Sequence, residues 1–207
     1  MSPVRIAVLI SGSGSNLQAI IDKIVKNEIN GELVVVISNK ENAYGLERAK
    51  KYDIEGLFID STTTDQDEYN RLILNALLER NIELVILAGY LKILDKKIIE
   101  AYKDRIINIH PSLIPSFCGK GFYGLKVHQS AVDYGVRVSG ATVHFVDEKA
   151  DNGPIILQKA IPLDFDDTAE SLQRKVLILE HELLPEAVKL FCDGKLSVIG
   201  RKVSISE

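Results

Sequence analysis

The chain has few cysteines, no excess of positive charge and no long hydrophobic run. Its two cysteines, Cys118 and Cys192, lie far apart and form no CxxC pair. The sequence therefore suggests neither a disulfide framework nor a zinc site, and we expect two ordinary reduced thiols. The net charge of −4 leaves no broad basic surface, which argues against a protein whose main partner is a nucleic acid.

The first apolar run, residues 4–10, is too short for a signal segment or a membrane span, because Ser11 and Gly12 interrupt it. We therefore expect a cytoplasmic protein with no membrane partner. The four histidines include no i, i+4 pair of the kind that binds a metal on a helix, and we expect no metal.

Short apolar runs alternate with longer amphipathic stretches in the first half of the chain. The run Leu33–Ile37, Leu-Val-Val-Val-Ile, is typical of a strand buried on both faces, and the helical patterns between such runs supply the crossovers of a parallel sheet. The sequence thus predicts an α/β fold with a doubly wound, mostly parallel, Rossmann-like sheet. The expected strands are Val4–Ile10, Leu33–Ser38, Gly56–Asp60, Glu83–Ala88 and Arg105–Ile109.

The pattern changes after residue 109. A glycine-rich loop, Ser116–Gly124, precedes a short helix, and the strand-like runs Val136–Val146 and Ile155–Pro162 flank the acidic turn Asp147–Gly153. These two runs predict an antiparallel edge of the sheet.

A long amphipathic helix is predicted from Asp167 to about Cys192, with N-terminal caps offered by Asp166, Asp167 and Thr168 and a kink suggested by Pro185. From Leu196 onward we expect a weak strand and a frayed tail. With 207 residues and no linker, the chain is expected to form one domain.

The segment Ser11–Asn16, Ser-Gly-Ser-Gly-Ser-Asn, joins the first strand to a helix beginning near Leu17. Glycines let the backbone approach an anion, and the helix N-terminus supplies unpaired N–H groups, so a phosphate fits here. The alternative is a simple tight turn. A dinucleotide fingerprint is incomplete, because the third glycine is missing and Ser38-Asn39 stands where an acidic residue would hold a ribose. A GxxxxGK[ST] motif is also absent, which leaves a phosphate monoester as the better match.

A second polar motif, Asn108-Ile-His110-Pro111, follows a hydrophobic run. Residues two apart on a strand project from the same face, so the amide of Asn108 and the imidazole of His110 can converge on one substrate group. Asp151 is the candidate partner that would orient and charge His110. The alternative is a structural histidine and a carboxylate that caps its own turn. Among the other histidines, His144 is expected to line this site.

Five segments resemble the 10-formyltetrahydrofolate-dependent formyltransferase family, and the resemblance spans essentially the whole chain. The N-terminal loop and the short single-domain length point to the glycinamide ribonucleotide branch of that family. The five segments are Ile10–Asn16, Leu87–Leu94, Asn108–Leu113, Gly140–Val146 and Asp151–Ile155.

The resemblance implies transfer of a formyl group from 10-formyltetrahydrofolate to the amine of glycinamide ribonucleotide, a step of purine biosynthesis that requires no metal. On the matching positions, Asn108 would hydrogen-bond the formyl oxygen. His110 would stabilise the tetrahedral intermediate and shuttle a proton, and Asp151 would keep His110 charged and oriented.

The resemblance also implies a monomer or weak homodimer. It further implies which parts of the chain bind the two substrates. A phosphate-binding half, about 1–104, would be followed by a folate and catalytic half, about 105–207. The rival interpretations are a hydrolase that gives the formyl group to water and a non-catalytic nucleotide-binding module. The residues expected to contact the ribonucleotide are Gly14, Ser15, Asn16, Pro111 and Glu180, and those expected to contact the folate are Leu91, Lys92, Ile93, Leu94, Asn108 and Asp147.

Overall fold

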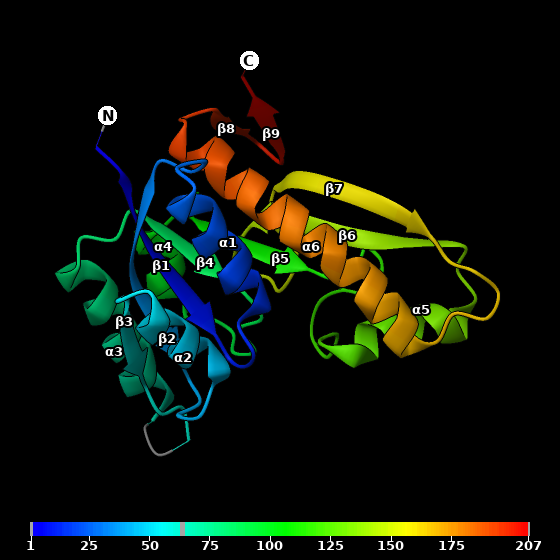
Figure 1. Cartoon of the computed structure of the whole chain (residues 1–207), viewed down its shortest axis with the longest axis horizontal. Helices are drawn as coiled ribbons and strands as arrows, with labels where there is room; N and C mark the ends of the chain where they lie inside the picture. The colour runs from blue at the N-terminus through cyan, green and yellow to red at the C-terminus, as the bar shows by residue number, and fades with distance from the viewer. Residues whose placement is uncertain (1, 63–64, 207) are drawn as a thin grey trace. The chain divides into compact units, whose positions relative to one another are not determined.

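The computed structural model describes residues 2–62 and 65–206, and the chain divides after Ile107 into two compact units (Figure 1). Strand β5, Ile106–His110, spans this division. Among the described residues, no helix is both long enough and apolar enough to cross a membrane.

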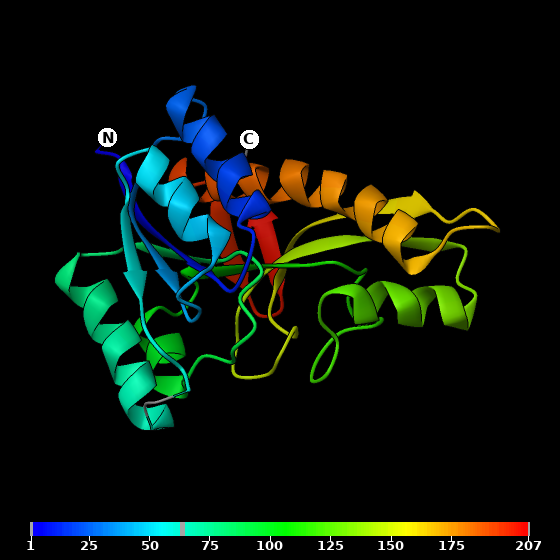
Figure 2. The ribbon, with the colours of Figure 1, turned by 60° about the horizontal axis from the view of Figure 1, so that its bottom comes forward.

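The first unit is a parallel sheet covered by helices on both faces. Its strands pair in the order β3-β2-β1-β4, and every pairing is parallel. Figure 2 shows α1 and α2 on one face of these strands and α3 and α4 on the other. The doubly wound parallel pattern is therefore confirmed. The elements are β1 (Val4–Ile10), α1 (Ser15–Val25), β2 (Gly31–Ser38), α2 (Tyr44–Lys51), β3 (Glu55–Phe58), α3 (Gln66–Glu79), β4 (Leu84–Leu87) and α4 (Lys96–Ala101).

The central strands of this unit are buried on both faces, as their continuous apolar sequence predicts. Val35, Val36 and Ile37 of β2 are fully buried, and so are Val8 and Leu9 of the neighbouring β1. Burying a branched aliphatic side chain contributes roughly 1.5–3 kcal/mol, so these strands form the core that fixes the ends of β1 and β4.

The second unit carries the antiparallel part of the sheet. Strand β6 (Val138–Phe145) pairs antiparallel with β7 (Ile155–Pro162), which confirms the predicted edge. The short helix α5 (Leu125–Tyr134) follows the glycine-rich loop, and the long helix α6 (Ala169–Cys192) runs along β6 and β7 (Figure 1).

Helix α6 begins at the cap that the sequence offers. The Thr168 hydroxyl accepts a hydrogen bond from the Ser171 N–H, and the Ser171 hydroxyl accepts one from the Thr168 N–H. This capping box satisfies two N–H groups that would otherwise have no partner at the helix start. The helix continues through Pro185 to Cys192.

The expectation of a frayed C-terminal tail is wrong. The strands β8 (Leu196–Ile199) and β9 (Lys202–Ile205) form an antiparallel hairpin, and β9 adds in parallel to the start of β7. Only two residues connect the strands, and the first of them, Gly200, has a φ of +61°, which glycine adopts without steric cost.

Candidate active site

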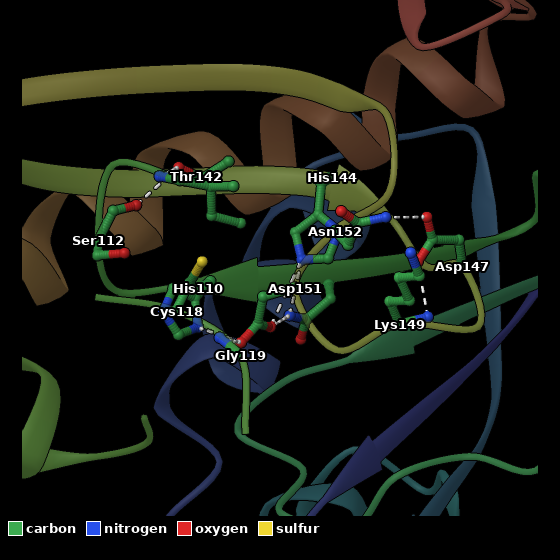
Figure 3. Close-up of polar contacts among 12 residues, drawn as sticks. His110, Ser112, Cys118, Gly119, Thr142, His144, Asp147, Lys149, Asp151 and Asn152 are labelled. Carbon is green, nitrogen blue, oxygen red and sulfur yellow. Dashed lines mark hydrogen bonds and ion pairs between the residues drawn. The ribbon is translucent and has the colours of Figure 1, made fainter. Parts of the chain in front are cut away.

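The three residues predicted to carry the chemistry lie together in the second unit, and Figure 3 shows His110 and Asp151 side by side. Asn108 and His110 are on β5, two residues apart, and Asp151 comes from the turn between β6 and β7. The Asp151 carboxylate lies 3.4 Å from His110 Nδ1 and accepts a hydrogen bond from Asn108 Nδ2 at 3.4 Å. The structure therefore brings the amide, the imidazole and the carboxylate into one polar cluster.

The turn that carries Asp151 is held close to the end of β6. Asp151 has a φ of +51°, a conformation that Asp tolerates better than most residues. A Cβ added at Gly153 would lie 1.8 Å from the Phe145 carbonyl oxygen, so only glycine fits there, and the Phe145 N–H donates to the Pro154 carbonyl. These backbone constraints hold the Asp151 carboxylate above β5.

Each oxygen of the Asp151 carboxylate accepts a hydrogen bond and also lies near a histidine nitrogen. Its Oδ2 accepts from the Gly119 N–H at 2.8 Å and faces His110 Nδ1. Its Oδ1 accepts from Asn108 Nδ2 and lies 3.8 Å from His144 Nε2. An ionised carboxylate only accepts hydrogen bonds, and Gly119 and Asn108 supply one donor to each oxygen.

His110 is buried, with 4% of its surface exposed, and each of its ring nitrogens faces an acceptor. Nε2 lies 3.0 Å from the Phe117 carbonyl oxygen, and Nδ1 faces the Asp151 carboxylate. A carbonyl oxygen can only accept, so Nε2 carries a proton in this arrangement. The site can accommodate a second proton on Nδ1, which would make His110 an ion-pair partner of Asp151.

His144 lines the cluster, as expected, and its tautomer follows from its partners. Nδ1 lies 2.8 Å from the Phe145 carbonyl oxygen and therefore carries the proton, which leaves Nε2 to accept from Asn108 Nδ2 at 3.1 Å. Burial lowers the pKa of His144, because removing the imidazolium from water is costly. His144 thus orients the Asn108 amide as a neutral acceptor.

The segment after β5 is fixed by β6. The Thr142 hydroxyl donates to the Ser112 carbonyl at 2.6 Å and accepts from the Ile114 N–H at 3.1 Å (Figure 3). Pro111, half-buried, lies between His110 and this anchored stretch. Cys118 donates its S–H to the Pro115 carbonyl, and burial, together with the charge of Asp151, raises the pKa of its thiol. These surroundings favour the neutral thiol.

Two groups of this site escaped the sequence reasoning, the Phe117 carbonyl and the Gly119 N–H. Both belong to the backbone of the loop Ser116–Gly124, so no side-chain pattern could identify them. The only signal was the density of glycines in that loop. Gly119 has a φ of +85°, which a residue with a side chain rarely adopts.

The predicted phosphate loop lies in the first unit, at the C-terminal end of β1. Gly14, with a φ of +69°, is the N-cap of α1, and no side chain caps this helix. Ser15 and Asn16 form its first turn, and Asn16 is buried. A hollow of about 520 Å³ lies beside the loop and is lined by residues 11–13 and 40–44. The loop therefore has the uncapped helix start that anion binding needs.

The segment predicted to form the folate pocket follows β4 in the same unit. Leu91 and Ile93 are 52% and 64% exposed, whereas Leu94 is buried and Lys92 is half-buried. Two exposed apolar side chains two residues apart are compatible with contact to a flat ring. The Leu91 N–H donates to the Ser11 hydroxyl, so this N–H is already used.

The remaining predicted contacts lie in the second unit. The Asp147 carboxylate bonds within its own turn, to the Lys149 N–H and the Asn152 side chain, and Glu180 is half-buried on α6. Over residues 2–62 and 65–206, no group of three or more histidine, cysteine or acidic side chains is arranged to hold a metal ion.

Comparison with known proteins identifies the family. The formyl transferase family matches residues 4–188. The phosphoribosylglycinamide formyltransferase of Haemophilus influenzae is 39% identical, over 93% of this chain and 89% of its own. Glycinamide ribonucleotide transformylase 1 from Symbiobacterium toebii is 42% identical, with a TM-score of 0.94 over 100% of this chain and 95% of its own.

Some relatives are longer than this chain. The chloroplastic phosphoribosylglycinamide formyltransferase of Vigna unguiculata is 38% identical over 93% of this chain, but the chain spans only 62% of that protein. The match nevertheless covers nearly the whole of the described fold and its polar cluster. The chain belongs to the formyl transferase family, among the phosphoribosylglycinamide formyltransferases.

Proposed function

We propose that this protein transfers the formyl group of 10-formyltetrahydrofolate to the amine of glycinamide ribonucleotide, giving formylglycinamide ribonucleotide and tetrahydrofolate in de novo purine biosynthesis. The observation that carries the proposal is the cluster of Asn108, His110 and Asp151, in which an amide, an imidazole and a carboxylate share hydrogen bonds or close polar contacts. Family membership supports the same reaction.

The proposed chemistry proceeds through a tetrahedral intermediate. The substrate amine attacks the formyl carbon, and the carbonyl oxygen becomes an oxyanion. Asn108 donates an N–H to that oxygen, and His110, protonated and held by Asp151, stabilises the developing charge. Collapse of the intermediate breaks the bond to N10 of the folate. The proton lost by the amine is delivered to N10, so the reaction needs neither metal nor oxidant.

The proposed binding groups divide between the two substrates. For the ribonucleotide, Gly14, Ser15 and Asn16 hold the phosphate, while Glu180 bonds the ribose hydroxyls and Pro111 contacts the same substrate. The uncapped start of α1 supports the phosphate assignment.

For the folate, the exposed side chains of Leu91 and Ile93 support a pocket formed by residues 91–94. In this pocket backbone groups read the pterin edge, and the apolar side chains of the segment, Leu94 included, cover its ring. Asn108 contacts the formyl group, and Asp147 contacts the folate from the turn after β6.

The test follows tetrahydrofolate release from 10-formyltetrahydrofolate by the purified protein, with and without glycinamide ribonucleotide, and identifies the product by mass. Release that requires the ribonucleotide, with one formyl group added to it, is the expected result. Release into water without the ribonucleotide would instead identify a hydrolase. No release from folded protein would favour a binding module.

Cytoplasmic location and a monomeric or weakly dimeric state belong to the same proposal. The expected location follows from the short first apolar run, residues 4–10, and the oligomeric state from the resemblance to the family; neither a nucleic acid nor a membrane is a proposed partner. Sedimentation at micromolar and millimolar concentrations, together with fractionation of the source cells, tests these two points.

A further inference from the structure

The first turn of α2 packs directly on the predicted phosphate loop. The Gly45 N–H donates to the Gly12 carbonyl at 3.1 Å. A Cβ added at Gly14 would lie 2.7 Å from the Cα of Gly45, and one added at Gly45 would lie 2.3 Å from Ile10 Cδ1. The two backbones therefore approach so closely that a side chain at either glycine would collide with its neighbours. The packing of α2 against the loop thus constrains the conformation of the loop.

Arg48 completes this contact from the next turn of α2. Its Nε donates to the Ser13 carbonyl at 2.9 Å, and its Nη1 donates to the Gln18 side chain on α1 at 2.9 Å. The guanidinium carbon lies 4.9 Å from the centre of the Tyr44 ring. A planar, forked donor with one face on an aromatic ring has little freedom to leave these partners.

These bonds engage the carbonyl oxygens of the loop and not its N–H groups. The carbonyl oxygens of Gly12 and Ser13, which would repel a phosphate, both accept hydrogen bonds from α2. The first turn of α1 contains no acidic residue. The two carbonyl oxygens that precede the N-cap of α1 are thereby bonded to α2, which favours the approach of an anion to this helix end.

We propose that Arg48 is a positioning residue for the substrate phosphate, which acts by holding the Ser13 carbonyl against α2. This inference rests on the proposed function, because it concerns the ribonucleotide of that reaction. Arg48 bonds the loop and not the phosphate, so its loss should weaken recognition of the phosphate and leave the formyl chemistry unchanged.

The test compares Arg48→Met, which keeps the aliphatic stem beside Gly14, with Lys51→Met. Lys51 is a matched control, because it lies on the same helix and its Nζ is 5.5 Å from the centre of the same Tyr44 ring, whereas its recorded side-chain bond is to the Tyr44 hydroxyl. Each variant is assayed with glycinamide ribonucleotide and with glycinamide riboside, which lacks the phosphate.

For Arg48→Met, kcat/KM for the ribonucleotide should fall about tenfold, the size expected for a charge-assisted hydrogen bond. The value for the riboside, or its inhibition constant if it is not turned over, should stay within about twofold of wild type. Lys51→Met should change neither value. Arg48→Lys should recover only part of the loss, because one ammonium group cannot reproduce the planar fork.

Two results would overturn this inference. One is an Arg48→Met variant whose kcat/KM is unchanged for both substrates, and the other is an equal fall of kcat/KM for both substrates, which would indicate a general structural role. A wild-type protein that does not formylate the ribonucleotide at all would instead overturn the proposed function, so the two failures are distinguishable.

Discussion

Asp151→Asn should lower kcat by about two to four orders of magnitude while the protein stays folded. The substitution keeps the shape of the side chain but replaces one acceptor by a donor. Oδ2 accepts from Gly119 and faces His110, and Oδ1 accepts from Asn108 and faces His144. The single amide oxygen of Asn can accept from either Gly119 or Asn108, so the NH₂ group of the new side chain must face the other N–H donor.

The magnitude follows from the pair of charges. At a separation of 3.4 Å, opposite unit charges attract by about 5 kcal/mol for an effective dielectric constant of about 20. Desolvation offsets part of this attraction, which leaves roughly 3–5 kcal/mol, or a factor of about 10² to 10⁴ in rate.

The assay measures kcat at saturating substrates, together with the circular dichroism spectrum and the melting temperature of each variant. Glu148→Gln removes a charge from the same turn and should retain wild-type kcat within about twofold, because an exposed carboxylate contributes little. A folded Asp151→Asn enzyme with kcat within threefold of wild type would refute the assignment of Asp151 as the partner of His110.

Three further predictions concern the same unit. Gly119→Ala should lower kcat by roughly ten- to hundredfold, because the Gly119 N–H donates to the Asp151 carboxylate. Gly121→Ala is the control, since Gly121 has a similar φ of +93°, and it should have a much smaller effect. Equal losses of kcat in the two variants would contradict this prediction. Gly153→Ala should lower the free energy of unfolding by about 3 kcal/mol or more, measured in urea, because its Cβ would collide with the Phe145 carbonyl; an unchanged midpoint would refute that collision. Burial lowers the pKa of His128 to about 4. At pH values between this pKa and the usual imidazole pKa, His128 is protonated in the unfolded chain but neutral in the folded protein. The folded state should therefore become less stable as the pH is lowered. From pH 6.5 to 4.5 the free energy of unfolding in urea should decrease by about 2 kcal/mol more for wild type than for His128→Gln. Equal decreases in the two proteins would rule out this contribution of His128.

The parts of the fold that the sequence predicts are those that a local pattern determines. The apolar run at Val35–Ile37 specifies a strand buried on both faces, and Thr168 specifies a helix start through its own side chain. The i, i+2 spacing of Asn108 and His110 places them on one face of β5. In each case the physical cause lies within a few residues of its effect.

The parts that the sequence does not predict depend on backbone groups brought together over distance. The bond between Gly45 and Gly12 of the predicted phosphate loop joins residues that are 33 positions apart in the sequence, and no periodicity of the sequence indicates it. The C-terminal hairpin was missed for a related reason. Its strands are four residues each, too short for alternation to be evident, and pairing with β7 anchors them.

The polar hydrogens of Asn108 and of His110 Nε2 are already engaged by protein acceptors, so the proposed reaction must exchange one of these bonds. The two N–H groups of Asn108 Nδ2 point to His144 and Asp151, and His110 Nε2 bonds the Phe117 carbonyl. A formyl oxygen can gain a donor only by replacing one of these partners. The bonds that Asn108 donates differ in length, 3.1 Å to His144 and 3.4 Å to Asp151. Because the bond to Asp151 is the longer and weaker of the two, exchanging it for the formyl oxygen costs less than breaking the bond between Asn108 and His144, which holds the amide in its orientation.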